Sequence, residues 1–165
     1  MKIFKLAVIS LFFMSMLIVG ISLFIPGHTR VSRAITIPFP AERITPVITD
    51  LRNWPRWNEL ILPDAAGNLQ MQEQKITGKE WALERVGQTD STITFRWTMQ
   101  GKEAIQNIFT VTPYGSESTV VQWYFDFEVN WYPWEKFGSI LFDRQLGPSM
   151  ERSLEKLKKN AGSPL

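Results

Sequence analysis

The chain has 165 residues, of which 44% are hydrophobic and 13% aromatic, and its net charge is only +2. This length and apolar content predict one compact domain and exclude a disordered chain. The chain has no run of basic residues that would track phosphates, which argues against nucleic-acid binding. Because it has no cysteine, disulfides, thiol nucleophiles and cysteine metal sites are excluded.

The single histidine, His28, stands next to an N-terminal apolar segment and outside the region expected to form the domain. We therefore expect no histidine acid–base chemistry and no histidine metal cluster inside the domain. The sequence also has no glycine-rich phosphate loop, no G-x-S-x-G motif and no metal-ligand spacing. These features predict no metal site, no cofactor and no catalytic residue.

Residues 6–25, Leu6 to Ile25, carry no charge and are followed by Pro26 and Gly27. At a rise of about 1.5 Å per residue, such a helix reaches about 30 Å, the thickness of a bilayer's hydrocarbon core. We therefore predict a tail at 1–5, a transmembrane anchor at 6–25 and a linker at 26–30. A cleaved signal peptide and a buried core helix are the alternatives. The run is longer than a usual signal peptide's apolar region, and it has no polar stripe of the kind a core helix shows.

The orientation of this anchor depends on the basic residues at its two ends. Lys2 and Lys5 stand before the apolar run, and Arg30 and Arg33 stand after it, so the positive-inside count is nearly balanced. Lys5 abuts the run, whereas the arginines are several residues away. This favours a cytoplasmic N-terminal tail and an extracytoplasmic domain.

In the rest of the chain, residues 31–37 alternate as a strand does, and residues 41–51 place apolar residues at helical spacing. Trp54 and Trp57 are expected to share a face of a second short helical turn. A turn is predicted at 63–68. Strand patterns follow at 69–76, 80–86, 91–99, 104–112 and 119–129. A long apolar stripe predicts a helix at 135–160, kinked or interrupted at Gly147-Pro148, before a frayed tail at 161–165.

This order predicts an α+β domain at 31–160. Strands joined by tight turns, each with one apolar face, favour a single antiparallel sheet. The long C-terminal helix is the only predicted element large enough to cover that face.

Two segments carry a family resemblance. The stretch RAITIPFPAERITPVITDLRNWPRWNEL, from Arg33, resembles the opening of the START-like (SRPBCC, polyketide cyclase-like) superfamily, in which an aspartate precedes a W-x-x-W pair. Here those residues are Asp50, Trp54 and Trp57. The stretch LFDRQLGPSMERSLEKLK is similar to the closing helix of bacterial members, many of which also begin with one apolar helix.

The resemblance implies a helix-grip fold, in which a curved antiparallel sheet wraps around the C-terminal helix and leaves a cavity between them. It implies a hydrophobic small molecule or a lipid as the partner, and the bacterial cytoplasmic (inner) membrane as the location. It identifies no protein partner.

Apolar residues on the predicted strand faces and helices are candidates for a cavity wall, although such residues also serve simply as packed core. Trp134 belongs to a Trp131-Tyr132-Pro133-Trp134 cluster, which suits a packed corner, a cavity mouth or a membrane-interface contact. The candidate cavity residues are Trp54, Trp57, Phe95, Trp97, Met99, Phe109, Trp123, Phe125, Phe127, Trp134, Leu141 and Met150.

Among the polar residues, Asp50 is expected to be a helix-end carboxylate that binds nearby backbone. Asp126 and Glu128 lie two apart on one strand face, which is otherwise polar and favours solvent exposure. Arg96 is a possible cross-strand partner for one of these acids.

Three functions fit these features. The first is a tethered domain that binds a hydrophobic small molecule or lipid. The second is a membrane-proximal interaction module with a vestigial cavity, which predicts a large exposed apolar patch. The third is a cyclase- or dehydratase-like enzyme, which predicts a carboxylate or tyrosine with a shifted pKa inside the cavity.

Overall fold

The computed structural model describes residues 2–61, 69–101 and 103–162. The turn predicted at 63–68, and residues 163–165 of the predicted tail, lie outside these ranges. In chain order the elements are α1 Lys2–Ser22, β1 His28–Ile37, α2 Ala41–Thr49, the 3-10 helix η1 Leu51–Arg56, β2 Gln70–Met71, β3 Lys75–Thr77, β4 Trp81–Gln88, β5 Thr92–Met99, β6 Ile105–Tyr114, β7 Ser118–Glu128, α3 Pro133–Ser139 and α4 Phe142–Ala161.

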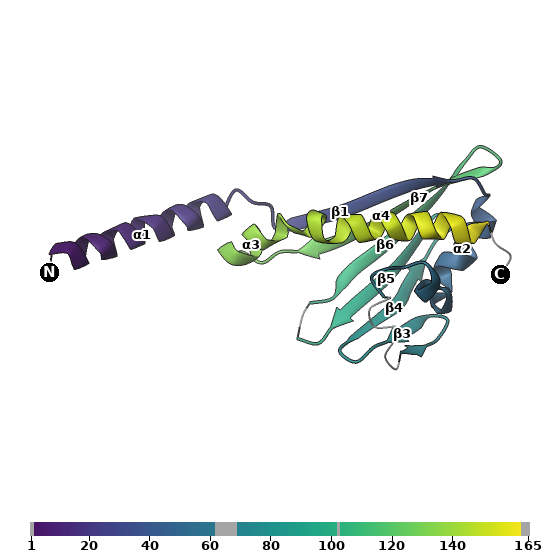
Figure 1. Ribbon diagram of the computed structural model, residues 1–165, viewed down its shortest axis with the longest axis horizontal. Coiled ribbons are helices and arrows are strands. Elements are labelled where there is room, and N and C mark those ends of the chain that lie inside the picture. Colours follow the sequence, from purple (N-terminus) through teal and green to yellow (C-terminus); the bar gives the residue numbers. More distant parts are fainter. Residues whose placement is uncertain (1, 62–68, 102, 163–165) are drawn as a thin grey trace.

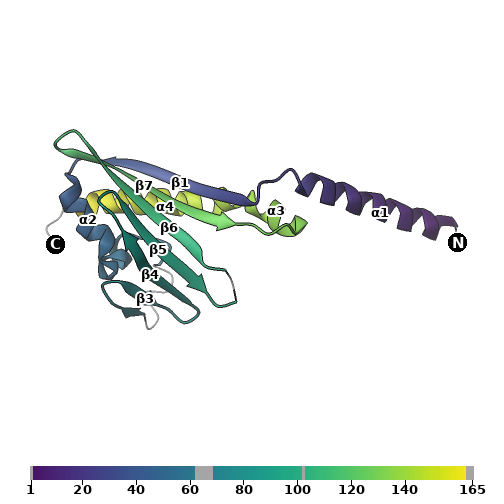
Figure 2. The same cartoon turned by 180° about the vertical axis from the view of Figure 1, so that it is seen from behind.

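Within the described residues, the strands form one antiparallel sheet in the order β1-β7-β6-β5-β4-β3-β2. The curved sheet and the long helix α4 form the predicted α+β helix-grip fold (Figure 1). Helix α4 lies against β1 and α2, while α2 contacts β6 and η1 contacts β3. Figure 2 shows the sheet from behind, with α4 on its far side. One face of the sheet is therefore covered jointly by α4, α2 and η1.

Helix α1 projects from one end of the domain (Figure 1). Its residues Ile3–Ser22 are long and apolar enough to cross a membrane, with a mean hydropathy of 2.3 and none of the most apolar window buried. This exposure rules out the core-helix alternative and leaves a membrane span or a signal sequence. The helix starts earlier than the predicted anchor and ends at Ser22, three residues before Ile25.

The space between the sheet and η1 is filled by the aromatic core cluster, which is fully buried. Trp54 and Trp57 supply the rings from η1 and the residue after it, and their centroids lie 5.1 Å apart. Trp54 contacts the Phe95 ring at 4.8 Å, and Trp57 contacts the Phe109 ring at 6.0 Å. The cluster consists of Trp54, Trp57, Phe95, Phe109 and Trp123.

Helix α4 departs from the sequence-based expectation. The predicted single helix is divided at Ile140–Leu141 into α3 and α4, and α4 then continues through Gly147 and Pro148. The expected interruption at Gly147-Pro148 was wrong, and Gly147 has a different role. A side chain there would collide with the guanidinium of Arg33, which crosses the helix at this point. Glycine therefore allows a close approach at this position.

Two sets of ion pairs connect α4 to the rest of the domain. Arg33 of β1 binds Asp143 at 2.7 Å and Glu151 at 2.6 Å, one helical turn on either side of Gly147. From the segment after η1, Glu59 accepts from Arg152 at 2.6 Å and pairs with Lys156 at 2.8 Å. These contacts hold the pKa of Glu59 below its ordinary value, through the hydrogen bond from Lys156 first and that from Arg152 second.

The two buried tryptophans provide a matched stability test. Trp54 Nε1 donates to the carbonyl of Ile48 at 2.7 Å, near the end of α2, whereas Trp57 Nε1 has no partner among the described residues. Trp54→Phe leaves a buried carbonyl unpaired, while Trp57→Phe removes an unpaired donor. We expect Trp54→Phe to lower the free energy of unfolding by about 1–2 kcal/mol more than Trp57→Phe. Urea unfolding of the detergent-solubilised chain measures both, and an equal loss would contradict the assignment.

The ion pairs of Glu59 predict a pH dependence. A carboxyl whose pKa is lower in the folded state adds stability above its unfolded pKa, about 4.3, and loses it as pH falls through the folded value. We expect Glu59→Gln to lower stability at pH 7 by at most about 1 kcal/mol, because its basic partners are half-exposed.

Thermal unfolding at pH 7 and at lower pH checks this, since the difference between wild type and Glu59→Gln is expected to close in acid. Glu155→Gln, on an exposed part of α4, is the control and is expected to track wild type. A difference that persists unchanged below the folded pKa would contradict the ion-pair account.

Candidate functional site

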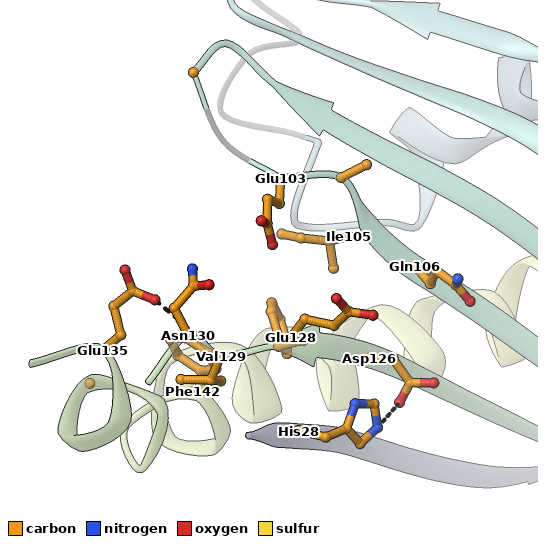
Figure 3. Close-up of a pocket in the computed structure, with 14 residues that line it drawn as sticks. His28, Glu103, Ile105, Gln106, Asp126, Glu128, Val129, Asn130, Glu135 and Phe142 are labelled. Atoms are coloured by element: carbon orange, nitrogen blue, oxygen red, sulfur yellow. Dashed lines mark hydrogen bonds and ion pairs between the residues drawn. The ribbon is translucent and has the colours of Figure 1, made fainter. Parts of the chain in front are cut away.

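A wedge opens in the sheet where β6 and β7 separate. Among the described residues, their pairing ends at Gln106 and Asp126. Strand β7 continues to Glu128 with β1 as its neighbour. The space between the β5–β6 hairpin, β7 and α3 is a pocket of about 650 Å³. Figure 3 shows Glu103 and Ile105 on one side of this wedge pocket, opposite the end of β7.

One wall of the wedge pocket is apolar. Ile105, Phe127 and Val129 come from the inner face of the sheet, and Phe142 comes from the start of α4. The Phe127 and Phe142 rings lie 4.7 Å apart. These side chains continue the hydrophobic core outward to the opening, so the wall suits the apolar part of a ligand.

The other wall is polar, because residues on the outer face of β1 and β7 also line the wedge. Asp126 binds Arg30 through two hydrogen bonds of 2.6 and 2.8 Å, and its Oδ1 lies 3.5 Å from Nε2 of His28. The hydrogen bonds that Arg30 donates to Asp126 raise the pKa of Arg30 above its ordinary value. Glu128 follows on the same face. A polar end group would therefore find charged partners on this side.

His28 requires a correction. Strand β1 begins at this residue, three positions before the predicted start, inside the stretch assigned to the linker. The ladder pairs His28 with Glu128, and the histidine lines the wedge pocket. The sequence-based exclusion of histidine from the domain was wrong, because the short connection after α1 leads directly into the sheet.

Helix α3 closes the third side. Glu135 and Gly138 line the pocket from this helix, and the Glu135 carboxylate accepts from the backbone N–H of Asn130 at 3.1 Å (Figure 3). A Cβ built at Gly138 would have no atom within 4 Å. The pocket therefore has free space on the α3 side.

Two residues near Ile105 in the sheet carry buried donors without a partner among the described residues. Trp123 Nε1 donates to Asn107 Oδ1 at 2.6 Å, so the amide nitrogen of Asn107 must face elsewhere, since an indole nitrogen only donates. That nitrogen and Trp97 Nε1 are buried without a partner among the described residues. Trp97 pairs with Ile105, and Asn107 lies two residues further along β6.

The cavity residues expected from the sequence differ in how deeply the structure buries them. Of these residues, only Phe127 lines the wedge pocket. Buried in the core are Trp54, Trp57, Phe95, Phe109, Trp123, Phe125 and Met150. Partly buried are Trp97, Met99 and Phe127. Exposed are Trp134 and Leu141.

Sequence reasoning did not single out several residues that line the wedge. Ile105 and Val129 do lie on strand faces predicted to be apolar, so alternation had placed them on the right side. The periodicity of a sequence does not indicate where β6 separates from β7. It is this separation that places Ile105 and Val129, among many similar apolar residues, in the wall of the pocket.

The other polar predictions had mixed outcomes. Asp50 is the expected helix-end carboxylate, because it accepts from the backbone of Arg52 at 3.0 Å and precedes η1. Its bond with the Arg52 side chain lowers its pKa. Arg96 faces Glu84 and Gln106 in the ladder, so neither Asp126 nor Glu128 is its cross-strand neighbour, and the expected pairing with one of these acids was wrong. Within the described residues, no group of three histidine or acidic residues is placed to hold a metal ion.

Comparison with known families decides the classification. Residues 28–162 match the family described as polyketide cyclase / dehydrase and lipid transport. The chain belongs to this family. The match begins at the first residue of β1 and ends just after α4, so the whole helix-grip domain of this polyketide cyclase-like protein is included. No curated protein matches the sequence.

Solved structures share the fold at low sequence identity. Truncated norcoclaurine synthase from Thalictrum flavum aligns with a TM-score of 0.61 and 13% identity, over 84% of this chain and 96% of that one. A START superfamily protein from Mycobacterium smegmatis aligns with 0.57 and 16%, over 82% and 97%. The di-domain ARO/CYC BexL from the BE-7585A biosynthetic pathway aligns with 0.60 and 16%, over 80% and 46%. These likenesses establish the polyketide cyclase-like fold alone.

Proposed function

We propose that the chain is a membrane-anchored START-like domain that binds a hydrophobic small molecule or lipid in the wedge pocket. The pocket carries this proposal. Its volume of about 650 Å³ lies within the range of small-molecule sites, and it combines an apolar wall with a few convergent polar groups.

The two walls favour an amphipathic ligand. Its apolar part would pack on Ile105, Phe127 and Phe142, and its polar end would lie toward His28 and Glu128. Behind this wall, the buried Phe125 ring lies 6.0 Å from the Phe127 ring and 6.2 Å from the Trp97 ring. The aromatic core cluster, expected from the sequence to be part of the wall, would form the packed limit of the cavity.

The anchor is the second part of the proposal. Residues Ile3–Ser22 would hold the domain at the bacterial inner membrane, on its extracytoplasmic side. Exposed apolar side chains run along α1, and their removal from water is favourable only in an apolar surrounding. The alternative function, a membrane-proximal interaction module, is favoured by one observation, the exposed aromatic side chains around α3.

The ligand is expected to be found by native mass spectrometry of the full chain, purified in mild detergent from its own host. We expect an additional mass that is lost on organic extraction. Gly138→Leu would place an apolar side chain into the free space of the pocket and is expected to abolish that mass.

Ala34→Leu, which introduces the same side chain at an exposed position of β1, is the control and is expected to retain the mass. A wild-type chain without additional mass would contradict ligand binding. A Gly138→Leu chain that retains as much ligand as wild type would contradict the location.

A further inference from the structure

Helix α3 is amphipathic, but its polar face is buried and its apolar face is exposed. Its polar residues Lys136 and Ser139 are buried, with only 8% and 3% of their surface exposed. The apolar side chains of Trp134 and of Ile140, the residue directly after the helix, are by contrast 69% and 61% exposed. Folding in water buries apolar surface and leaves charge outside, so this helix is built for a different surrounding.

The exposed apolar side chains lie within residues 131–141, and we call them the α3 patch. Three of its rings are in contact, with centroid distances of 4.8 Å from Trp131 to Tyr132 and 4.8 Å from Tyr132 to Trp134. The α3 patch consists of Trp131, Tyr132, Trp134, Phe137, Ile140 and Leu141.

The buried polar face attaches α3 to the end of α1. Lys136 Nζ donates to the carbonyl of Ile25 at 2.8 Å, and Ser139 Oγ donates to the Lys136 carbonyl at 2.8 Å. Helices α1 and α3 are in contact. Lysine therefore faces inward because it binds a carbonyl just beyond the end of α1.

The connection from α1 to the sheet is short, so it keeps α3 close to the end of α1. Helix α1 ends at Ser22, and the Gly27 carbonyl already accepts from Val129 at 2.8 Å. The intervening residues span at most about 3.6 Å each, so the connection reaches less than about 18 Å. In Figure 1, α3 lies at the end of the domain from which α1 projects.

We propose that the α3 patch lies in the interfacial layer of the membrane that α1 crosses. Tryptophan and tyrosine favour this layer because their rings combine an apolar body with a polar group. A helix with one exposed apolar face lies in the plane of the interface. This inference rests on the anchor of the proposed function, and it does not depend on a ligand in the wedge pocket.

The absence of cysteine from the chain allows single labelling sites. Three full-length variants, Ile140→Cys, Leu11→Cys and Tyr114→Cys, would carry an environment-sensitive NBD fluorophore in phosphatidylcholine vesicles containing nitroxide-labelled phosphatidylcholine. All three positions are exposed. Position 140 reports the α3 patch, and position 11 reports α1. Position 114 is at the β6–β7 turn, at the end of the domain away from α1 (Figure 1).

We expect blue-shifted emission and quenching by the lipid nitroxide at positions 11 and 140, with quenching at 140 several-fold stronger than at 114. Quenching at 11 alone, with 140 resembling 114, would overturn the docking of α3 and leave the anchor intact. A label at 140 shielded from both lipid nitroxide and aqueous iodide would overturn it in favour of a protein partner or a second copy. Loss of quenching at 11 would remove the anchor and the docking together.

Discussion

The burial of Trp54 and Trp57 against the sheet is the interaction on which the rest of the structure depends. An antiparallel sheet with one apolar face needs a cover, and α4 lies mainly along β1. The two indoles fill the adjacent space and pack on Phe95, Phe109 and Trp123. Protein interiors are packed as densely as organic crystals, and these buried rings form the packed core at this end of the grip.

The consequence is that open space lies at the other end. There β6 leaves β7 after the Gln106–Asp126 pair, and neither η1 nor its tryptophans reach the gap. The wedge pocket is bounded by α3 instead. Because α3 also binds the connection after α1 through Lys136, the opening of the sheet and the apolar N-terminal helix are at the same end of the molecule. One seven-residue helix thus joins a pocket wall, an apolar surface and the base of α1.

The family match and the solved structures establish the helix-grip fold, and the fold by itself does not identify a reaction or a ligand. The proposed function rests on features of this chain: the separation of two strands, one apolar and one polar wall, and a glycine with free space beside it. Norcoclaurine synthase and the ARO/CYC protein share the architecture at 13% and 16% identity. Their side-chain chemistry is a property of those proteins.

Local pattern was sufficient for much of this protein. Alternation in β5, β6 and β7, helical spacing in α2 and α4, and the length of the first apolar segment determined the elements, because each depends on residues close in sequence. Alternation also determined which strand residues face inward. It did not determine which of those residues are packed core and which line a pocket. That distinction depends on where β6 parts from β7 and on what η1 places between them.

The positions of His28 and α3 likewise depend on tertiary contacts that local pattern does not indicate. Only the pairing of β1 with β7 brings His28 beside Asp126, and only the contact with Ile25 makes Lys136 the inward residue of α3. Taken alone, the sequence of α3 is a short run of aromatic and charged residues that suits a packed corner as well as a surface. The sequence by itself therefore determined most of the elements, their apolar faces and the family. The tertiary structure decided the pocket and the exposed aromatic surface, because both arise from contacts between residues that are not neighbours in the sequence.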